Sequence, residues 1–194
     1  MIVAVALCSL AQTPAQMLDK AAASIKQGGM VSATYAVKSS QGSYSGTLVM
    51  SGNKFRLLSA PVKCWYDGST QWTYSVSTGE VNVTTPSASD LQMTNPYAAV
   101  QSFKSNFNMW KAYTQVAGSY TVKLMPKRKS NIKQVLIYIA NGSCQIKKAV
   151  FEMTNGTRTT ISISNYKTHV NYPASTFTFS KSQVPAGTQV VDLR

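Results

Sequence analysis

The stretch from Gly46 to Pro96 decides the fold. It contains, in order, GTLVMSGNKFRL at residues 46–57, WYDGSTQWTYSVSTGEVNV at residues 65–83 and LQMTNP at residues 91–96. Apolar and polar residues alternate in the first two segments, which is typical of strands with one buried face. Asp67-Gly68 and Thr78-Gly79 are hairpin turns in which glycine supplies the positive φ. The stretch therefore predicts consecutive antiparallel strands followed, at Asn95-Pro96, by the start of a helix.

The same period-two pattern continues along most of the chain. Further tight turns are expected at Asn141-Gly142 and Asn155-Gly156. Residues 86–95, rich in Ser, Thr, Asn and Pro, are expected to form an irregular link. The predicted strands are 31–38, 43–50, 53–59, 62–66, 70–76, 80–85, 110–116, 118–126, 132–140, 143–153, 157–168 and 175–180.

Two short helices are expected. The first begins at Thr13, which can act as an N-cap with Gln16 in a capping box, and it ends at Gly28-Gly29. Its apolar residues recur at helical spacing: Met17, Leu18, Ala21, Ala22 and Ile25. The second starts at Asn95-Pro96 and carries Tyr97, Val100 and Phe103 along one face. Both helices therefore need an apolar surface to cover.

About a dozen antiparallel strands with two short helices predict a mainly β protein. Several strands are apolar on both faces, most clearly VLIYI at 135–139. Such a sheet must be covered on both sides or must enclose something, and two short helices cannot fill the inside of a sheet this wide. We therefore expect one strongly curved antiparallel sheet, an open half barrel, with the helices as a lid over an apolar cavity. Without an internal repeat or linker, residues 12–194 form a single domain.

The chain is strongly basic. Its 194 residues carry a formal net charge of +13, although only 13% of residues are charged. No acidic residue occurs between Asp90 and Glu152, whereas nine basic residues do: Lys104, Lys111, Lys123, Lys127, Arg128, Lys129, Lys133, Lys147 and Lys148. Such a region attracts phospholipid headgroups, an acidic partner surface or nucleic acid. The alternative is that lysines in turns only keep a low-charge β protein soluble.

The N-terminus, MIVAVALCSLAQ, indicates export. An apolar run followed by small residues is typical of a secretory signal, here residues 1–11 with cleavage before Gln12. Because a positively charged leader is missing, we expect the start of this signal to be truncated. The alternatives are a buried first strand and a lipoprotein acylated at Cys8.

Removal of the signal leaves Cys64 and Cys144, which can form a disulfide in an oxidising compartment or remain buried thiols.

The residues do not favour an enzyme. The one histidine, His169, lies in a polar strand end, and the six acids include no pair at catalytic or metal-ligand spacing. No phosphate-binding loop, CxxC, HExxH or GxSxG motif occurs. We therefore expect no catalytic residue, metal or cofactor.

Basic residues do alternate with aromatic ones at 97–129, but the export signal and the lack of a recognition motif count against nucleic-acid binding.

The order of these landmarks resembles the outer-membrane lipoprotein carrier protein family (LolA), as a divergent member. The resemblance rests on the entry helix, the Gly46–Pro96 stretch, a lid helix and the tail TFTFSKSQVPAGTQVVDLR at 176–194. This chain departs from the family at Ser51-Gly52, where members often carry proline, and at Leu57, where an aromatic residue is usual.

The resemblance implies a lid latch and a lipid-binding cavity. The arginine of the third strand, here Arg56, bonds to backbone of the lid helices in family members and holds the empty cavity shut. A guanidinium has five donors and can satisfy carbonyls at a helix end. The alternative is that Arg56 is an ordinary surface arginine of its strand. Strand facing supplies the candidate cavity residues: Phe55, Leu57, Trp65, Trp72, Tyr74, Leu91, Met93, Tyr97, Val100, Phe103, Met109 and Trp110.

The family resemblance also implies a function. The chain would be a monomeric periplasmic carrier of a Gram-negative bacterium that takes lipoproteins at the inner membrane and delivers them to the outer membrane. Its partners would be an inner-membrane ATP-driven transporter that releases lipoproteins and an outer-membrane acceptor. The alternative is a receptor or sensor of the same fold, anchored or periplasmic, that binds acyl chains without shuttling them.

Overall fold

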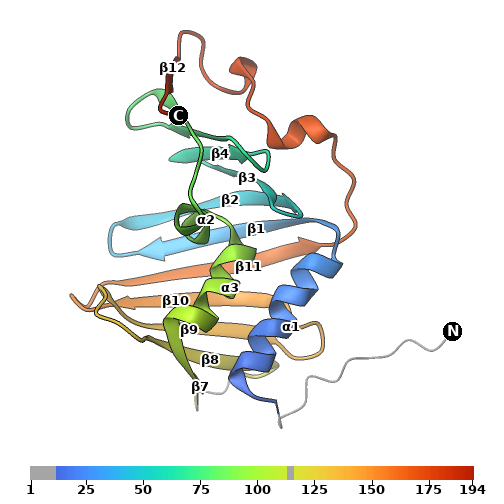
Figure 1. The fold of residues 1–194 in the computed structure, drawn as a ribbon, viewed down its shortest axis with the longest axis vertical. Coiled ribbons are helices and arrows are strands. Elements are labelled where there is room, and N and C mark those ends of the chain that lie inside the picture. Colours follow the sequence, from blue (N-terminus) through green and yellow to red (C-terminus); the bar gives the residue numbers. More distant parts are fainter. Residues whose placement is uncertain (1–11, 113–115) are drawn as a thin grey trace, which may run out of the picture.

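A computed structural model describes residues 12–112 and 116–194. The predicted signal peptide, residues 1–11, and Cys8 lie outside these residues. The described chain forms three helices, two 3-10 turns and one sheet of twelve strands (Figure 1). No helix of the described part is long and apolar enough to cross a membrane.

The helices and turns, in chain order, are α1 (Pro14–Gln27), α2 (Ala88–Thr94), α3 (Pro96–Asn106), η1 (Ala174–Phe177) and η2 (Lys181–Gln183). The strands are β1 (Met30–Ser39), β2 (Gly42–Ser51), β3 (Lys54–Ser59), β4 (Val62–Tyr66), β5 (Gln71–Ser75), β6 (Glu80–Thr84), β7 (Phe107–Lys111), β8 (Ser119–Pro126), β9 (Ile132–Ala140), β10 (Ile146–Met153), β11 (Arg158–Lys167) and β12 (Gln189–Asp192).

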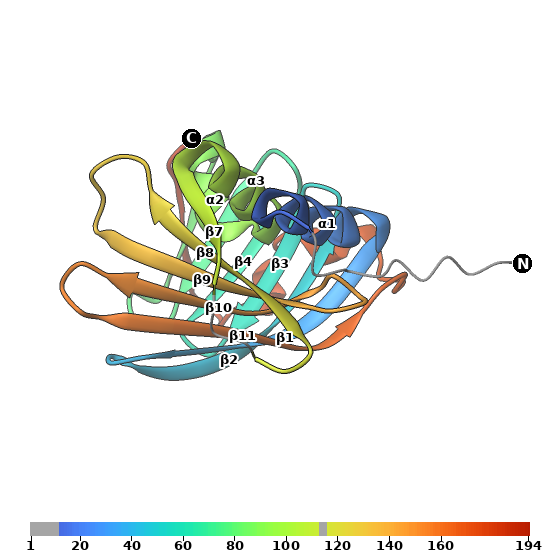
Figure 2. The same cartoon turned by 90° about the horizontal axis from the view of Figure 1, so that it is seen from below.

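The sheet is curled but open. Its strand order is β12-β6-β5-β4-β3-β2-β1-β11-β10-β9-β8-β7, so β12 and β7 form the two edges. All neighbours pair antiparallel except β12, which runs parallel to β6. Figure 2 shows the curvature, with α1, α2 and α3 gathered on one side. The predicted half barrel with a helical cover is therefore confirmed.

Strand register decides which side chains meet the helices. We call the face covered by the three helices the inner face and the opposite one the outer face. Successive side chains of a strand point to opposite faces. In β3, Phe55 pairs with Tyr66 of β4 and belongs to the apolar cluster that contacts the helices, whereas Arg56 pairs with Trp65. Arg56 and Trp65 consequently lie on the outer face.

The outer face near β3 and β4 is covered by the C-terminal segment. Trp65 is fully buried there, and its ring meets that of Phe179 edge-on with centroids 5.4 Å apart. Tyr74 and Val81 extend this outer cluster, which also contacts Val184. The tail thus gives this half of the sheet a second apolar layer.

Several element predictions are wrong. Residues 88–94 form α2 instead of an irregular link, because Ser87 and Asp90 make a reciprocal capping box. Residues 174–177 form η1, in which Thr176 N donates to Pro173 O, instead of the start of a strand. The strand expected at 110–116 spans Phe107–Lys111. The first helix, with its capping box at Thr13 and Gln16, is confirmed.

Candidate functional site

The inner face carries two apolar clusters beneath the helices. The first lies under α1 and α3, where Met17 and Leu18 are fully buried against strands β7 to β10. The second lies on β1 to β4, where Phe55 is fully buried and Leu91 of α2 packs on it. Tyr97, near the start of α3, contacts both clusters. Together the clusters form a continuous apolar interior between helices and sheet.

This interior is closely packed. Met17, Leu18, Phe55 and Leu124 have no accessible surface, so no water-sized space adjoins them. An elongated apolar ligand can therefore enter only if the helices move away from the sheet. Movement of that kind would turn the packed side chains of both clusters into the walls of a cavity.

The ends of the helical cover are tied to the sheet. The hydroxyl of Tyr120 on β8 donates to Gln12 O at the start of α1 (2.9 Å). At the end of α3, Lys127 Nζ donates to the carbonyl oxygens of Lys104 and Ser105 (3.2 and 3.0 Å). These bonds hold α1 and α3 at the β7–β8 edge.

Asn95 ties the junction of α2 and α3 to the sheet. Its side chain is 3% exposed, and its Nδ2 donates to Asn53 O in the β2–β3 turn (3.2 Å). Its Oδ1 accepts from the backbone N–H groups of Tyr97 and Ala98 at the start of α3. One amide therefore both caps α3 and fastens it to the sheet. The sequence marks Asn95 as a helix start, but nothing in it indicates a partner 42 residues away.

The predicted cavity residues divide between the two faces. The inner clusters contain seven of them: Phe55, Leu57, Leu91, Tyr97, Val100, Phe103 and Met109. Four others do not line the interior, because strand alternation or the outer cluster places them elsewhere: Trp65, Trp72, Tyr74 and Trp110. Met93 lies on α2, and its side chain is outside the described part.

Strand alternation places Arg56 on the face opposite the helices, so the described part of the structure contradicts its predicted latch role. A regular β3 that turns Phe55 and Leu57 inward must turn Arg56 outward. Its guanidinium carbon lies 6.0 Å from the centre of the Tyr172 ring, and its buried Nε has no hydrogen-bond partner. Burial lowers the pKa of Arg56.

Of the two possibilities for Cys64 and Cys144, a disulfide between them is absent. Cys64 is a free thiol, buried on the inner face of β4. The sheet order explains the separation, since β4 and β9, the strand that precedes Cys144, are six strands apart.

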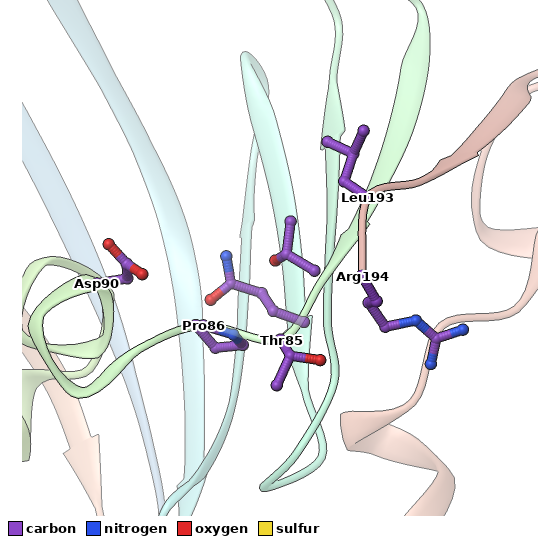
Figure 3. A pocket seen from close by; sticks show the side chains of 7 residues that line it. Thr85, Pro86, Asp90, Leu193 and Arg194 are labelled. Atoms are coloured by element: carbon purple, nitrogen blue, oxygen red, sulfur yellow. The ribbon is translucent and has the colours of Figure 1, made fainter.

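A depression of about 470 Å³ lies away from the helix-covered interior, between the β6–α2 link and the C-terminal residues (Figure 3). Its charged groups have partners: Arg194 pairs with Asp192 at 2.6 Å, and Asp90 caps α2. Among the described residues, no group of three His, Cys, Asp or Glu side chains could hold a metal ion. The helix-covered interior is therefore the better candidate site.

Comparisons with known proteins agree with this geometry. A family model described as outer membrane lipoprotein carrier protein LolA matches residues 5–157. This chain belongs to the LolA family. The match covers the helices and most of the sheet, and it ends before β11 and the C-terminal segment. The description is that of a carrier, not of an enzyme.

Solved structures resemble the chain at low sequence identity, and one of them shows the same fold. An uncharacterised conserved protein from Thermus thermophilus superposes with a TM-score of 0.63 and 12% identity, over 91% of this LolA-family chain and 97% of that one. A LolA superfamily protein from Nitrosomonas europaea gives a TM-score of 0.45 and 15% identity, over 87% and 99% of the two chains. No curated protein matches the chain.

Asn95 substitutions should loosen the cover of this LolA-family protein. Asn95→Ala is expected to lower the free energy of unfolding by about 2 kcal/mol, because it removes both a helix cap and a buried hydrogen bond. Asn95→Ser keeps a neutral capping oxygen and loses the Nδ2 donor to Asn53 O, so about half that loss is expected. Both variants should take up a fluorescent fatty acid faster in stopped-flow measurements. Unchanged uptake by Asn95→Ser would show that this bond does not restrain the helices.

Arg56→Leu is expected to leave fatty-acid binding unchanged and to raise the free energy of unfolding by about 1 kcal/mol. The reason is that leucine removes a half-buried cation whose Nε has no partner. Arg56→Lys, which retains the charge, should not be stabilised. Urea unfolding measures the stability of the two variants, and fatty-acid titration measures their affinity. Weaker fatty-acid binding by Arg56→Leu would show that Arg56 belongs to the binding site.

Cys64 should make stability depend on pH in alkaline solution. Burial raises the pKa of Cys64 to about 11, partly offset by the Thr73 hydroxyl. Between about pH 8.5 and 11 the unfolded chain loses the thiol proton and the folded chain keeps it, so stability falls as pH rises, by up to about 3 kcal/mol. Because buried tyrosines also titrate in this range, the measurement is the difference in unfolding free energy between wild type and Cys64→Ala. If the unfolding free energies of the two proteins fall equally with pH, Cys64 does not contribute to the pH dependence.

Proposed function

We propose that this protein is a periplasmic carrier that binds the acyl chains of lipoproteins between its helices and the inner face of the sheet, and ferries them from the inner to the outer membrane. One observation carries the proposal: two apolar clusters beneath the helices, joined at Tyr97, form one interior long enough to run from β4 to β8. Family membership supports the same role.

Loading would exchange one set of apolar contacts for another. An acyl chain gains about 0.8 kcal/mol for each methylene group removed from water. That gain would offset the loss of contacts when α2 and α3 leave the sheet and the bond from Asn95 to Asn53 breaks. The walls of the opened cavity would include Phe55, Leu57 and Val100. The empty protein would close again because closure returns these side chains from water to apolar contact with the helices.

Delivery would need no energy source in this chain. An inner-membrane ATP-driven transporter would load the carrier, and an outer-membrane acceptor that binds the acyl chains more tightly would unload it. The protein would act as a monomer, with each copy enclosing the acyl chains of one lipoprotein.

A release assay tests the proposal. Residues 12–194 are incubated with spheroplasts of the host that display newly made lipoproteins, and the supernatant is analysed for a soluble complex. Leu57 and Leu58 are adjacent, similarly buried and on opposite faces, so Leu57→Asp and Leu58→Asp form a matched pair. A one-to-one complex that Leu57→Asp abolishes and Leu58→Asp preserves is expected.

Two other outcomes would contradict the carrier role. If the protein releases no lipoprotein but binds a fluorescent fatty acid, it is an acyl-chain receptor or sensor. If it binds neither, the helix-covered interior is an ordinary core.

A further inference from the structure

One end of the sheet has a concentration of positive charge. Residues 91–151 contain nine of the chain's 19 basic residues and no acidic residue. They form α3, β7, β8, β9 and the first part of β10, which lie together at the lower end of the molecule in Figure 1. Folding therefore gathers this charge instead of spreading it over the surface.

Two large apolar side chains are exposed at the same end. Trp110 of β7 is 47% exposed and Met125 of β8 is 38% exposed. Trp110 pairs with Lys123, and Met125 pairs with Asn108, two residues before Trp110, so both side chains lie on the outer face. Within the described sheet β7 is an edge strand. Neither residue is needed for the apolar interior, which β7 contacts through Phe107 and Met109.

Basic side chains occur at the same end of the sheet. Lys123 pairs with Trp110 and lies on the same face, and Arg128, Lys129 and Lys133 are exposed in and beside the turn that follows β8. Of the acids at this end, Asp19 pairs with Lys104 at 2.8 Å, whereas Glu152 accepts a hydrogen bond from the neutral amide of Gln134 and keeps its charge. The surface consequently combines an exposed Trp-Met pair with an excess of positive charge.

We infer that this surface docks on an anionic phospholipid bilayer. We call it the basic edge and define it by Trp110, Lys123, Met125, Arg128, Lys129 and Lys133. Lysine and arginine are attracted to anionic headgroups, and tryptophan is favoured at the headgroup level, where its ring is partly buried and its N–H stays hydrated. An acidic protein would also attract the basic residues. The exposed Trp and Met side chains favour a bilayer, because both can insert among the lipids. Since α1 and α3 both contact β7, docking would bring the helical cover beside the membrane.

Vesicle co-sedimentation tests this inference without any cargo, so it is independent of the carrier proposal. The protein is expected to bind vesicles of phosphatidylglycerol and phosphatidylethanolamine, to lose binding in 0.5 M salt, and to ignore phosphatidylcholine vesicles. The triple variant Arg128→Gln/Lys129→Gln/Lys133→Gln should bind roughly 100-fold more weakly. Trp110→Ser/Met125→Ser should bind about tenfold more weakly.

A charge-matched control separates the basic edge from net charge. Lys54, Lys167 and Lys181 are exposed and lie outside residues 91–151, so replacing all three with Gln lowers the net charge equally. This control should keep wild-type binding. Equal loss in both triple variants, or no binding of the wild type to phosphatidylglycerol vesicles, would overturn the inference. A circular-dichroism spectrum and a urea unfolding midpoint equal to those of the wild type verify that each variant retains the fold.

Discussion

Phe55→Ala is expected to lower the free energy of unfolding by about 3–5 kcal/mol, and a long-chain fatty acid is expected to restore part of that loss. Phe55 is fully buried on the inner face and stacks at a tilt on Tyr66, with ring centres 5.3 Å apart. Its removal leaves an apolar void beneath α2. Because apolar voids bind apolar ligands instead of water, an acyl chain should stabilise this variant more than it stabilises the wild type.

Trp65→Ala is the matched control for Phe55→Ala. Trp65 is as deeply buried, but it lies on the outer face under the C-terminal segment. Its replacement should cost a similar amount of stability, about 3–5 kcal/mol, with no extra gain from the fatty acid. The measurement is the midpoint of thermal unfolding with and without ligand. An equal response of the two variants would mean that the ligand does not bind on the inner face.

Removal of residues 171–194 is expected to lower the free energy of unfolding by at least about 5 kcal/mol and to expose apolar surface to the dye ANS. The segment buries Trp65 and Tyr74, contributes Phe177 at 3% exposure, and supplies β12. Each large side chain returned to water costs about 1.5–3 kcal/mol. Although the family model ends at residue 157, these later residues are predicted to be essential for folding.

A shorter deletion provides the control for this truncation. A chain that ends at residue 188 loses β12, whose contact is with β6, but keeps η1, η2 and the cover over Trp65. It should lose much less stability and should not bind ANS. Cooperative unfolding of the longer truncation at wild-type denaturant concentration would show that the outer cluster is not needed.

Sequence periodicity predicted most strands of the sheet, because alternation of apolar residues and glycine-containing turns are local features of the sequence. Glycines at the turns, such as Gly68 and Gly79, have the positive φ that the sequence predicts. The tail was harder to predict, because TFTF alternates like a strand. Its first two residues instead end a 3-10 turn in which Phe177 is buried, and Phe179, just after the turn, packs on the outer cluster. That outcome depends on Trp65, more than a hundred residues away. Long-range packing of this kind leaves no local pattern.

The candidate site was predictable only in part. Helical spacing correctly predicted the inward face of α3, with Val100 and Phe103. Strand residues were less certain, because alternation separates two faces without saying which one the helices cover. Arg56 and Phe55 illustrate the point, since adjacent residues of one strand cannot both reach the interior. The role of Asn95 depends on a contact with a distant turn and is visible only in the folded chain.

The central claim is that acyl chains bind between the helices and the inner face. Met109 and Trp110 are consecutive residues of β7, and Met109 packs on the inner cluster while Trp110 is exposed on the outer face. A photo-crosslinking amino acid at either position, in the soluble complex with a lipoprotein that carries radiolabelled acyl chains, tests the claim directly. Labelled adducts from position 109 and none from position 110 are expected. Adducts from position 110 alone, or equally from both positions, would contradict it.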